Sequence, residues 1–254
     1  MGLPKFFVAP GSVRGSFLTL EGENAAHARV LRLRQGDRVL VCDGCGTDYS
    51  CTISDISPQQ VCLVVDSASA SASEPRVQCS VYMAYAKADK LEHVIQKATE
   101  LGAGEIVAFP SSRCVARLDE KTLAKKLERW QKIAASAAEQ SGRGRIPQVR
   151  AVRSFREAVL EAAERELLEE TGFAGENPHI IGKVCPNPAI QHNTCYVVKI
   201  DNVRRVSEPQ LEDTEDIEHL VVPQSKVREF LRSGAISHGI VLNALFFYLM
   251  DQCC

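Results

Sequence analysis

The sequence contains no apolar run long enough to cross a membrane. Its longest candidate, residues 239–250, falls short of the roughly 18 consecutive apolar residues that a transmembrane helix needs. We expect this segment to form a buried terminal helix instead. The first residues also lack the basic and then apolar layout that is typical of a secretory signal peptide. These absences predict a cytoplasmic protein with no membrane partner.

A second closely spaced cysteine pair is also missing. Cys42 and Cys45 have the spacing of a zinc knuckle, and Cys51 and Cys62 follow, but a structural zinc site needs four ligands. Without a secretory signal, cysteines are more often reduced thiols than disulfides. Most of the ten cysteines are therefore predicted to be ordinary thiols, with zinc as the less favoured alternative.

The net charge is close to zero because two halves of opposite sign cancel. Residues 1–156 hold 22 Lys and Arg against 16 Asp and Glu, which gives +6. Residues 157–254 hold 8 against 16, which gives −8. Such an asymmetry predicts two kinds of partner, and it places a junction near residue 157.

Residues 1–66 are predicted to form a small barrel, because they contain five short β-type runs separated by turn signals. The runs cover residues 6–8, 16–20, 38–42, 49–53 and 60–65. A helical stretch over residues 23–33 interrupts them, with His27, Arg29, Arg32 and Arg34 on it or just after it. These side chains suit a phosphate-binding surface, and an ordinary solvated helix face is the alternative.

Residues 67–76 have the serine and alanine composition of a linker. Beyond them the sequence predicts strands over 77–85 and 105–109, an amphipathic helix over 90–101 and a long helix over 120–141 that ends at Gly142. Alternation of strands and helices is typical of a parallel α/β sheet. We therefore assign residues 77–157 to an α/β domain.

Four motifs carry a family resemblance. Residues 29–37 (RVLRLRQGD), 87–90 (KADK), 96–102 (QKATELG) and 137–143 (AAEQSGR) resemble the 16S rRNA methyltransferase E family. The resemblance implies a PUA-like RNA-binding barrel and a partial SPOUT-type domain, which is knotted and dimeric in the family. It also implies transfer of a methyl group from S-adenosylmethionine to uridine N3 of small-subunit ribosomal RNA.

The same resemblance implies roles for particular residues. His27, Arg29, Arg32 and Arg34 would grip RNA, and Glu100, Gln140 and Arg143 would belong to the reaction centre or its support. The Arg143 guanidinium suits negative charge that develops when the uridine N3 proton departs. Alternatively, it is a cation held near a helix C-terminus by the helix dipole. The glycine-rich loop that binds the methyl donor in this family has no counterpart in residues 158–254, so we expect impaired methyl transfer.

A second resemblance begins near the junction. The run from Arg165 to Leu167, with Glu169, Glu170 and Gly172, resembles the end of a Nudix box, and residues 182–249 resemble ADP-ribose pyrophosphatase-like Nudix hydrolases. On a helix, Glu166, Glu169 and Glu170 share one face, where three carboxylates suit Mg²⁺. The resemblance implies hydrolysis of a nucleoside diphosphate, and a solvated acidic helix is the alternative. The strands that normally precede the box are missing, with the join between residues 155 and 164.

We expect an α/β and α+β multidomain chain that ends in a partial Nudix-like segment over residues 158–254. Three hypotheses follow: an impaired methyltransferase, a magnesium-dependent Nudix hydrolase, and a non-catalytic RNA-binding fusion or an artefact of gene deletion, cloning or assembly. An exposed large apolar side chain forfeits about 1.5–3 kcal/mol, against a domain stability of about 5–15 kcal/mol. Neither truncated domain is therefore expected to keep its family fold unaided, whereas the barrel has its own core.

Overall fold

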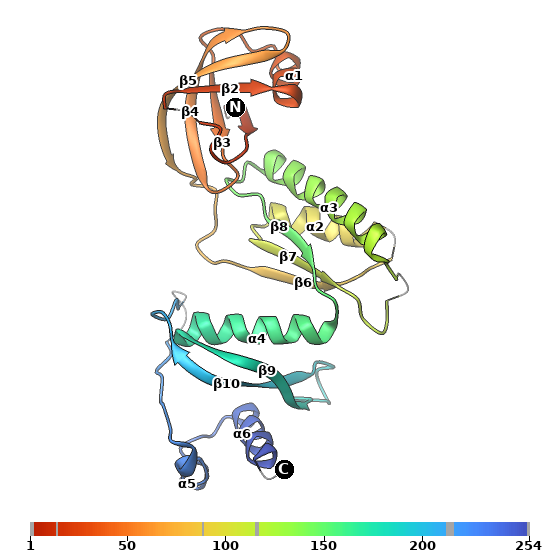
Figure 1. The fold of residues 1–254 in the computed structure, drawn as a ribbon, viewed down its shortest axis with the longest axis vertical. Helices are drawn as coiled ribbons and strands as arrows, with labels where there is room; N and C mark the ends of the chain where they lie inside the picture. The colour runs from red at the N-terminus through yellow and green to blue at the C-terminus, as the bar shows by residue number, and fades with distance from the viewer. Residues whose placement is uncertain (1–2, 14, 88, 115–116, 212–215, 253–254) are drawn as a thin grey trace. The chain divides into compact units, whose positions relative to one another are not determined.

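The computed structural model describes residues 3–13, 15–87, 89–114, 117–211 and 216–252. The chain divides into two compact units, Met1–Arg153 and Ser154–Cys254 (Figure 1). Among the described residues, the helices are all too short or too polar to span a lipid bilayer.

The first unit begins with a five-stranded sheet whose order is β1-β3-β4-β5-β2 (Figure 1). Its strands pair antiparallel, except that β1 runs parallel to β3. Alternate side chains of the strands point inward and bury Phe6, Leu20, Ile53 and Leu63, as the period of two residues requires. The five predicted strands are therefore confirmed, as β1 (Lys5–Phe7), β2 (Phe17–Glu21), β3 (Arg38–Cys42), β4 (Thr47–Ile56) and β5 (Gln60–Ala70).

The predicted linker is partly a strand. Strand β5 continues to Ala70, and Ala68, Ser69 and Ala70 pair with Tyr49, Asp48 and Thr47 of β4. The prediction of a linker over the whole of residues 67–76 is therefore wrong at its start. Small residues leave the backbone free to pair, and the partner strand satisfies backbone groups that would otherwise face water.

Residues 80–151 form a three-stranded parallel sheet of order β6-β7-β8, which confirms the predicted α/β pattern. Helices α2 and α3 pack against each other and against one face of this sheet, around Ile95, Ile106 and Trp130. Asp119 caps the N-terminus of α3, because its carboxylate accepts the Thr122 N–H, and the left-handed Gly142 caps the C-terminus. The bounds are β6 (Ser80–Ala84), α2 (Lys90–Glu100), β7 (Glu105–Phe109), α3 (Glu120–Ser141) and β8 (Gln148–Ala151).

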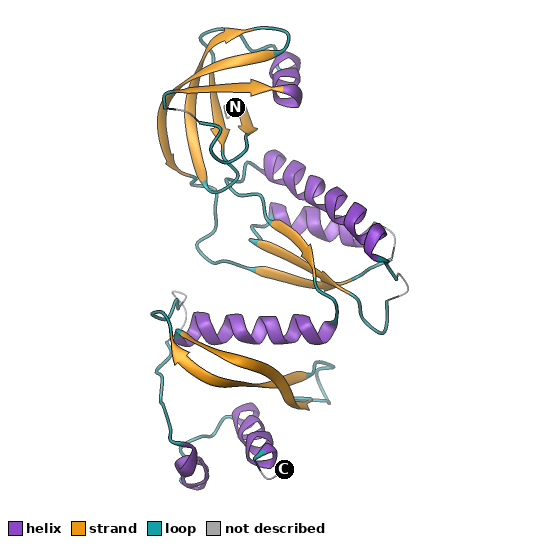
Figure 2. Cartoon of the chain, in the orientation of Figure 1, coloured by secondary structure: helices purple, strands orange, loops and turns teal. Residues whose placement is uncertain are grey.

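The second unit consists of an antiparallel ribbon, β9–β10, against which two helices, α4 and α6, pack (Figure 2). Ser154 caps the N-terminus of α4, because its hydroxyl accepts the Glu157 N–H, and the left-handed Gly172 caps the C-terminus. Two short helices, η1 and α5, precede the terminal helix. The bounds are α4 (Phe155–Thr171), β9 (Phe173–Val184), β10 (Cys195–Arg205), η1 (Gln224–Lys226), α5 (Val227–Arg232) and α6 (Gly239–Asp251).

The prediction of a buried terminal helix is wrong. Helix α6 has no buried residue, and Val241, Phe246 and Met250 are 42%, 56% and 53% exposed. A two-stranded ribbon is too narrow to cover a helix that is apolar on all sides. In the part of the second unit that the structure describes, the buried hydrophobic side chains are Ala158 and Val197. Residues 212–215, within the stretch that resembles Nudix hydrolases, lie outside the described residues.

Candidate nucleic-acid interface

The cationic cluster predicted in the barrel lies around α1 (Gly22–Val30). Arg29, Arg32 and Arg34 are exposed, and none of them forms an ion pair with another described residue. Arg32 has a positive φ of 56°, so the chain leaves the helix before residue 33, the predicted end. The three guanidinium groups therefore follow one helix end and its loop, and they are available to an anionic partner.

His27 differs from these arginines because it contacts the α/β part of the same unit. Its ring packs edge-on against Phe6, with 5.6 Å between the ring centroids. Its Nδ1 atom lies 3.5 Å from Oε1 of Glu139, near the end of α3. Both side chains remain partly exposed, at 45% and 37%. His27 therefore connects the cationic helix to the residue next to Gln140.

A pocket of about 310 Å³ lies between the C-terminal ends of α2 and α3. It brings together two of the three predicted reaction-centre residues, Glu100 and Gln140, with Gln96, Lys97 and Ser141. Glu100 accepts hydrogen bonds from Lys97 Nζ at 2.7 Å and from Gln96 Nε2 at 3.0 Å. The bond from Lys97 is the main reason why the pKa of Glu100 lies below its usual value. The pocket thus offers an anionic oxygen, an ammonium group and two amides, which are hydrogen-bonding groups of the kind that read a nucleobase edge.

Arg143, the third predicted reaction-centre residue, is not among the residues that line this pocket. It is only 3% exposed, and its guanidinium bonds entirely to internal acceptors. Nη2 lies 2.6 Å from Glu74 Oε2, Nε donates to Glu74 Oε1 at 3.3 Å, and Nη1 donates to the carbonyls of Thr99 and Ala103. Thr99 lies in the last turn of α2, so Arg143 places a cation at the C-terminus of this helix.

Glu74 joins the end of the predicted linker to the turn after α3. Its Oε1 atom also accepts the backbone N–H groups of Gly144 and Arg145, at 2.8 and 2.9 Å. Burial alone would raise the pKa of Glu74, but the hydrogen bonds from Arg143 and Gly144 outweigh burial and lower that pKa. The sequence pattern offered one weak signal for this role, a single carboxylate within a stretch of small residues.

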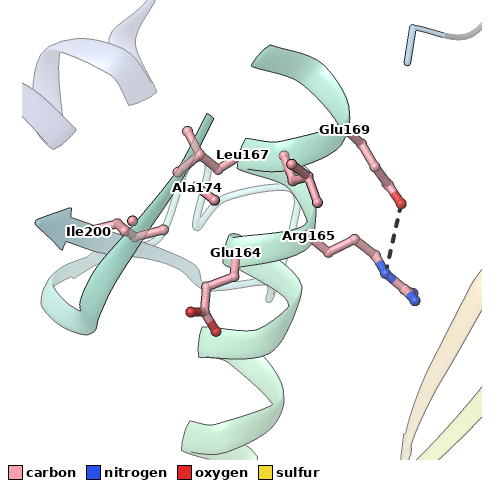
Figure 3. A pocket seen from close by; sticks show the side chains of 8 residues that line it. Glu164, Arg165, Leu167, Glu169, Ala174 and Ile200 are labelled. Carbon is pink, nitrogen blue, oxygen red and sulfur yellow. Dashed lines mark ion pairs between the residues drawn. The ribbon is translucent and has the colours of Figure 1, made fainter. Parts of the chain in front are cut away.

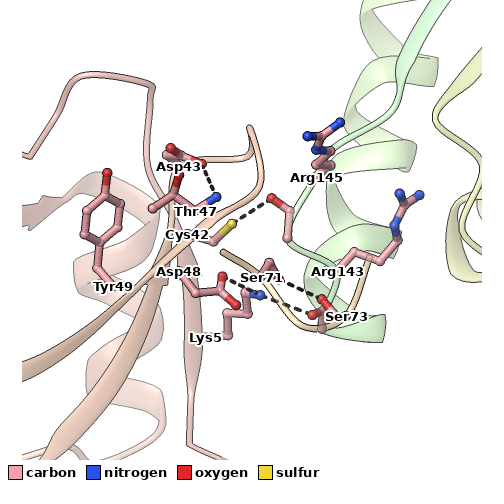
Figure 4. Close-up of polar contacts among 12 residues, drawn as sticks. Lys5, Cys42, Asp43, Thr47, Asp48, Tyr49, Ser71, Ser73, Arg143 and Arg145 are labelled. Atoms are coloured by element: carbon pink, nitrogen blue, oxygen red, sulfur yellow. Dashed lines mark hydrogen bonds and ion pairs between the residues drawn. The ribbon is translucent and has the colours of Figure 1, made fainter. Parts of the chain in front are cut away.

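The same turn is also held by the barrel (Figure 4). Lys5 Nζ donates to the Gly142 carbonyl at 3.2 Å and pairs with Asp48 at 2.8 Å. The Cys42 thiol donates to the Gly144 carbonyl at 2.9 Å. These contacts fix the barrel to the end of α3, so the cationic helix and the pocket belong to one compact unit.

The acidic helix of the second unit lines a different pocket, of about 310 Å³ (Figure 3). Glu164, Arg165 and Glu169 contribute to its wall, together with Leu167, Leu168, Ala174, Gly175 and Ile200. Of the three predicted magnesium ligands, only Glu169 lines it, and its Oε1 lies 3.8 Å from Arg165 Nε. Among the described residues, His, Cys, Asp and Glu form no group of three that is placed to hold a metal ion. The predicted triad of Glu166, Glu169 and Glu170 is thus not gathered as a metal site.

The candidate zinc cysteines occupy different environments. Cys42 and Cys51 are buried, Cys62 is half-buried and Cys45 is exposed. Burial raises the pKa of the Cys42 and Cys51 thiols to about 11 in each case. Within the described ranges, none of these cysteines belongs to a group of three or more His, Cys, Asp or Glu that could hold a metal ion.

Two domain families match the first part of the chain. Residues 20–66 match the RNA methyltransferase PUA domain, and residues 73–177 match the RNA methyltransferase domain. The second match continues beyond the predicted junction. The barrel is thus similar to an RNA methyltransferase PUA domain, and the parallel α/β segment that follows it is similar to an RNA methyltransferase domain.

Individual proteins are also similar to this chain in sequence and in structure. Ribosomal RNA small subunit methyltransferase E of Bacillus subtilis is 38% identical over 143 residues, which cover 56% of this chain and 56% of that protein. The protein of the same name from Synechocystis is 33% identical over 165 residues, or 65% of this chain and 52% of that protein. The crystal structure of ribosomal RNA small subunit methyltransferase E from Neisseria gonorrhoeae bound to S-adenosylmethionine superposes with a TM-score of 0.56 at 28% identity, covering 62% of this chain and 65% of that one.

The N-terminal part of the chain is therefore similar in sequence to proteins named ribosomal RNA small subunit methyltransferase E, and in fold to a solved structure of one of them. The chain spans about half the length of the curated relatives it matches.

Proposed function

We propose that this chain binds small-subunit ribosomal RNA through the cationic helix of its barrel and presents a uridine to the pocket between α2 and α3. What supports the proposal is the contact of His27 with Glu139, which joins α1 to the residue beside Gln140. Phosphates would bind Arg29, Arg32 and Arg34, because exposed guanidinium groups form strong charge-assisted bonds with phosphate oxygens. The uracil edge would bind Glu100 and Gln140.

The residues of the structure do not fit a complete site for S-adenosylmethionine. In the family the donor site belongs to the segment after the α/β domain. Here the described residues after 153 form a separate unit whose two strands are antiparallel and do not extend the parallel sheet. We therefore infer that methyl transfer is impaired in this chain, while RNA binding is retained. The dimer expected from the family remains a prediction.

Binding measurements on the full chain test this proposal. Titration into a labelled fragment of 16S rRNA is expected to give an affinity that falls steeply with salt, with a slope that grows with the number of phosphate contacts. The double substitution Arg29→Ala and Arg32→Ala should lower the affinity at every salt concentration. Calorimetry with S-adenosylmethionine is expected to show weak or no binding. RNA affinity that does not depend on salt, or is unchanged in the double variant, would contradict the proposal.

A second candidate function is hydrolysis of a nucleoside diphosphate such as ADP-ribose by the acidic unit. The pocket beside Glu164 and Glu169 is the observation in its favour. The arrangement does not fit a preformed magnesium site, because Glu169 pairs with Arg165 and the three predicted ligands are not gathered. The test is release of nucleoside monophosphate from ADP-ribose with Mg²⁺ present. Release that Glu169→Gln abolishes would establish the hydrolase, and the same rate in both proteins would exclude this site.

A further inference from the structure

A row of exposed lysines follows the outer face of α3. Lys121, Lys125 and Lys132 are separated by four and seven residues. At 3.6 residues per turn, these positions fall within an arc of about 40° and span about 16 Å along the helix axis. All three side chains are exposed, and none forms an ion pair with another described residue. We name this row the lysine track.

The orientation of the track is fixed by the opposite face of the helix. Trp130 and Ala134 are at most 3% exposed and pack in the core of the α/β part, with Ile106 and Val149 of the parallel sheet. A rotation of α3 that turned the lysines inward would expose this apolar face, and burying an unpaired ammonium is costly. The lysine track therefore stays on the surface.

Other charges near the track leave it cationic. Arg129 lies beside it, but its guanidinium is paired with Glu92 at 2.7 Å. Two carboxylates of α3 fall in or near the same arc: Glu128, at about −20° from Lys121 and within the span of the track, and Glu139, about two turns beyond Lys132. Within that span, three unpaired lysines against one carboxylate leave an excess of two positive charges over about three turns of helix.

The lysine track lies on the side of α3 that contacts the cationic helix of the barrel. Glu139, 18 residues after Lys121, returns to the same side of α3 after five full turns and contacts His27 of α1. Arg29 lies two residues further along α1 and is exposed. Figure 1 shows the C-terminal end of α3 directed toward α1 in this unit. Between Lys132 and α1, the same side of α3 carries Glu139, so the track and α1 are two cationic surfaces separated by the contact of Glu139 with His27.

We propose that the lysine track is a second phosphate-binding surface, which holds the backbone of the RNA that the barrel grips. The inference rests on the proposed RNA-binding function and extends it to α3. Lysine ammonium groups on flexible stems suit phosphate contacts that fix the register of a nucleic acid but carry no sequence information.

Charge removal tests the track. The variant Lys121→Gln, Lys125→Gln, Lys132→Gln keeps good helix formers in α3 and removes three charges. Its affinity for a labelled 16S rRNA fragment is measured between 50 and 200 mM salt. Each lost phosphate contact should reduce the salt slope by about 0.7–0.9, so the slope should fall by about 2 and the affinity by about 10- to 100-fold. Circular dichroism checks that the helix content is unchanged.

The matched control changes the same total charge in the other compact unit. Lys226 of η1 and Arg228 and Arg232 of α5 are exposed, and their replacement by glutamine also removes three positive charges. The control is expected to keep the wild-type salt slope. If both variants lost the same RNA affinity and salt slope, the effect would come from net charge alone, and the proposal that the lysine track binds phosphate would be refuted.

The outcomes also separate the track from the proposed function. If the α3 variant binds like wild type while the variant in Arg29 and Arg32 loses affinity, the track is refuted and the barrel function stands. The same result would leave α3 open to an acidic protein partner. If wild type shows no salt-sensitive RNA binding, the proposed function fails, and the track fails with it.

Discussion

Replacement of Arg143 by methionine is expected to destabilise the first unit strongly. The guanidinium is 3% exposed, and its loss leaves the Glu74 carboxylate with a side chain only 13% exposed and no cation beside it. It also leaves the carbonyls of Thr99 and Ala103 without this donor. Removing one partner of a buried ion pair costs about 3–5 kcal/mol. Because Glu74 keeps two backbone N–H bonds, we expect a loss near the lower end, about 3 kcal/mol.

Urea unfolding of the full chain measures this loss directly. Trp130 is the single tryptophan of the sequence, and it is 3% exposed in the core of the α/β part, so its fluorescence reports on this unit. With an m-value of about 2 kcal/mol per molar urea, the midpoint should fall by about 1.5 M. Arg145→Met on the same turn is the control, because Arg145 is exposed and should change stability by less than about 0.5 kcal/mol.

The variant Arg143→Lys distinguishes the effect of the positive charge from the effect of the guanidinium geometry. Its ammonium keeps the positive charge but lacks the planar fork that bonds to Glu74, Thr99 and Ala103 together. We expect a midpoint between those of wild type and Arg143→Met. If all three proteins unfolded at the same urea concentration, the guanidinium would have no structural role, and the argument from its burial would be refuted.

Three further predictions use other parts of the structure. Glu74 has a folded pKa below its unfolded value of about 4.3, so its stabilisation is complete above that value and is lost as pH falls through the folded pKa. Between pH 5 and pH 3, the free energy of unfolding measured with urea should therefore fall more for wild type than for Glu74→Gln. Alkylation followed by mass spectrometry should modify exposed Cys45 at once, but buried Cys42, with a pKa of about 11, only after unfolding. Gly182→Val should release α6, because a Cβ at residue 182 would lie 2.3 Å from the Phe247 ring, and chymotrypsin should then cut α6 faster than in wild type.

Local patterns in the first unit predicted its elements well. The run from Glu105 to Phe109 is a strand with the predicted bounds, and the long helix ends at Gly142 as predicted. Both depend on signals within a few residues: an apolar run between turns, and a glycine that accepts a positive φ. The strand that continues to Ala70 was missed, because its stability comes from pairing with β4 and not from its own side chains.

In the candidate site, too, features that depend on local motifs were predicted, and features that depend on contacts distant in the sequence were not. Glu100 and Gln140 lie in motifs that the sequence singled out, and the packing of α2 against α3 brings them to one pocket. The internal position of Arg143 could not be read from its motif, because its partner Glu74 lies 69 residues away in a stretch with no regular pattern. The gathering of three glutamates on α4 was expected from helical spacing alone, but spacing does not determine whether side chains turn toward one another or, as Glu169 does, toward an arginine.

Hydrogen exchange on the full chain should separate the two units by stability. The barrel buries eleven hydrophobic residues in one cluster, whereas Ala158 and Val197 are the buried hydrophobic residues in the described part of the second unit. One large side chain contributes about 1.5–3 kcal/mol when buried, so the second unit lacks the burial that offsets chain entropy. We expect amides of β9, β10 and α6 to exchange through local openings at low cost, and those of β3, β4 and β5 only through global unfolding. Equal protection in both units would mean that the acidic unit is stabilised by contacts beyond its own core, and the argument from burial would then fail.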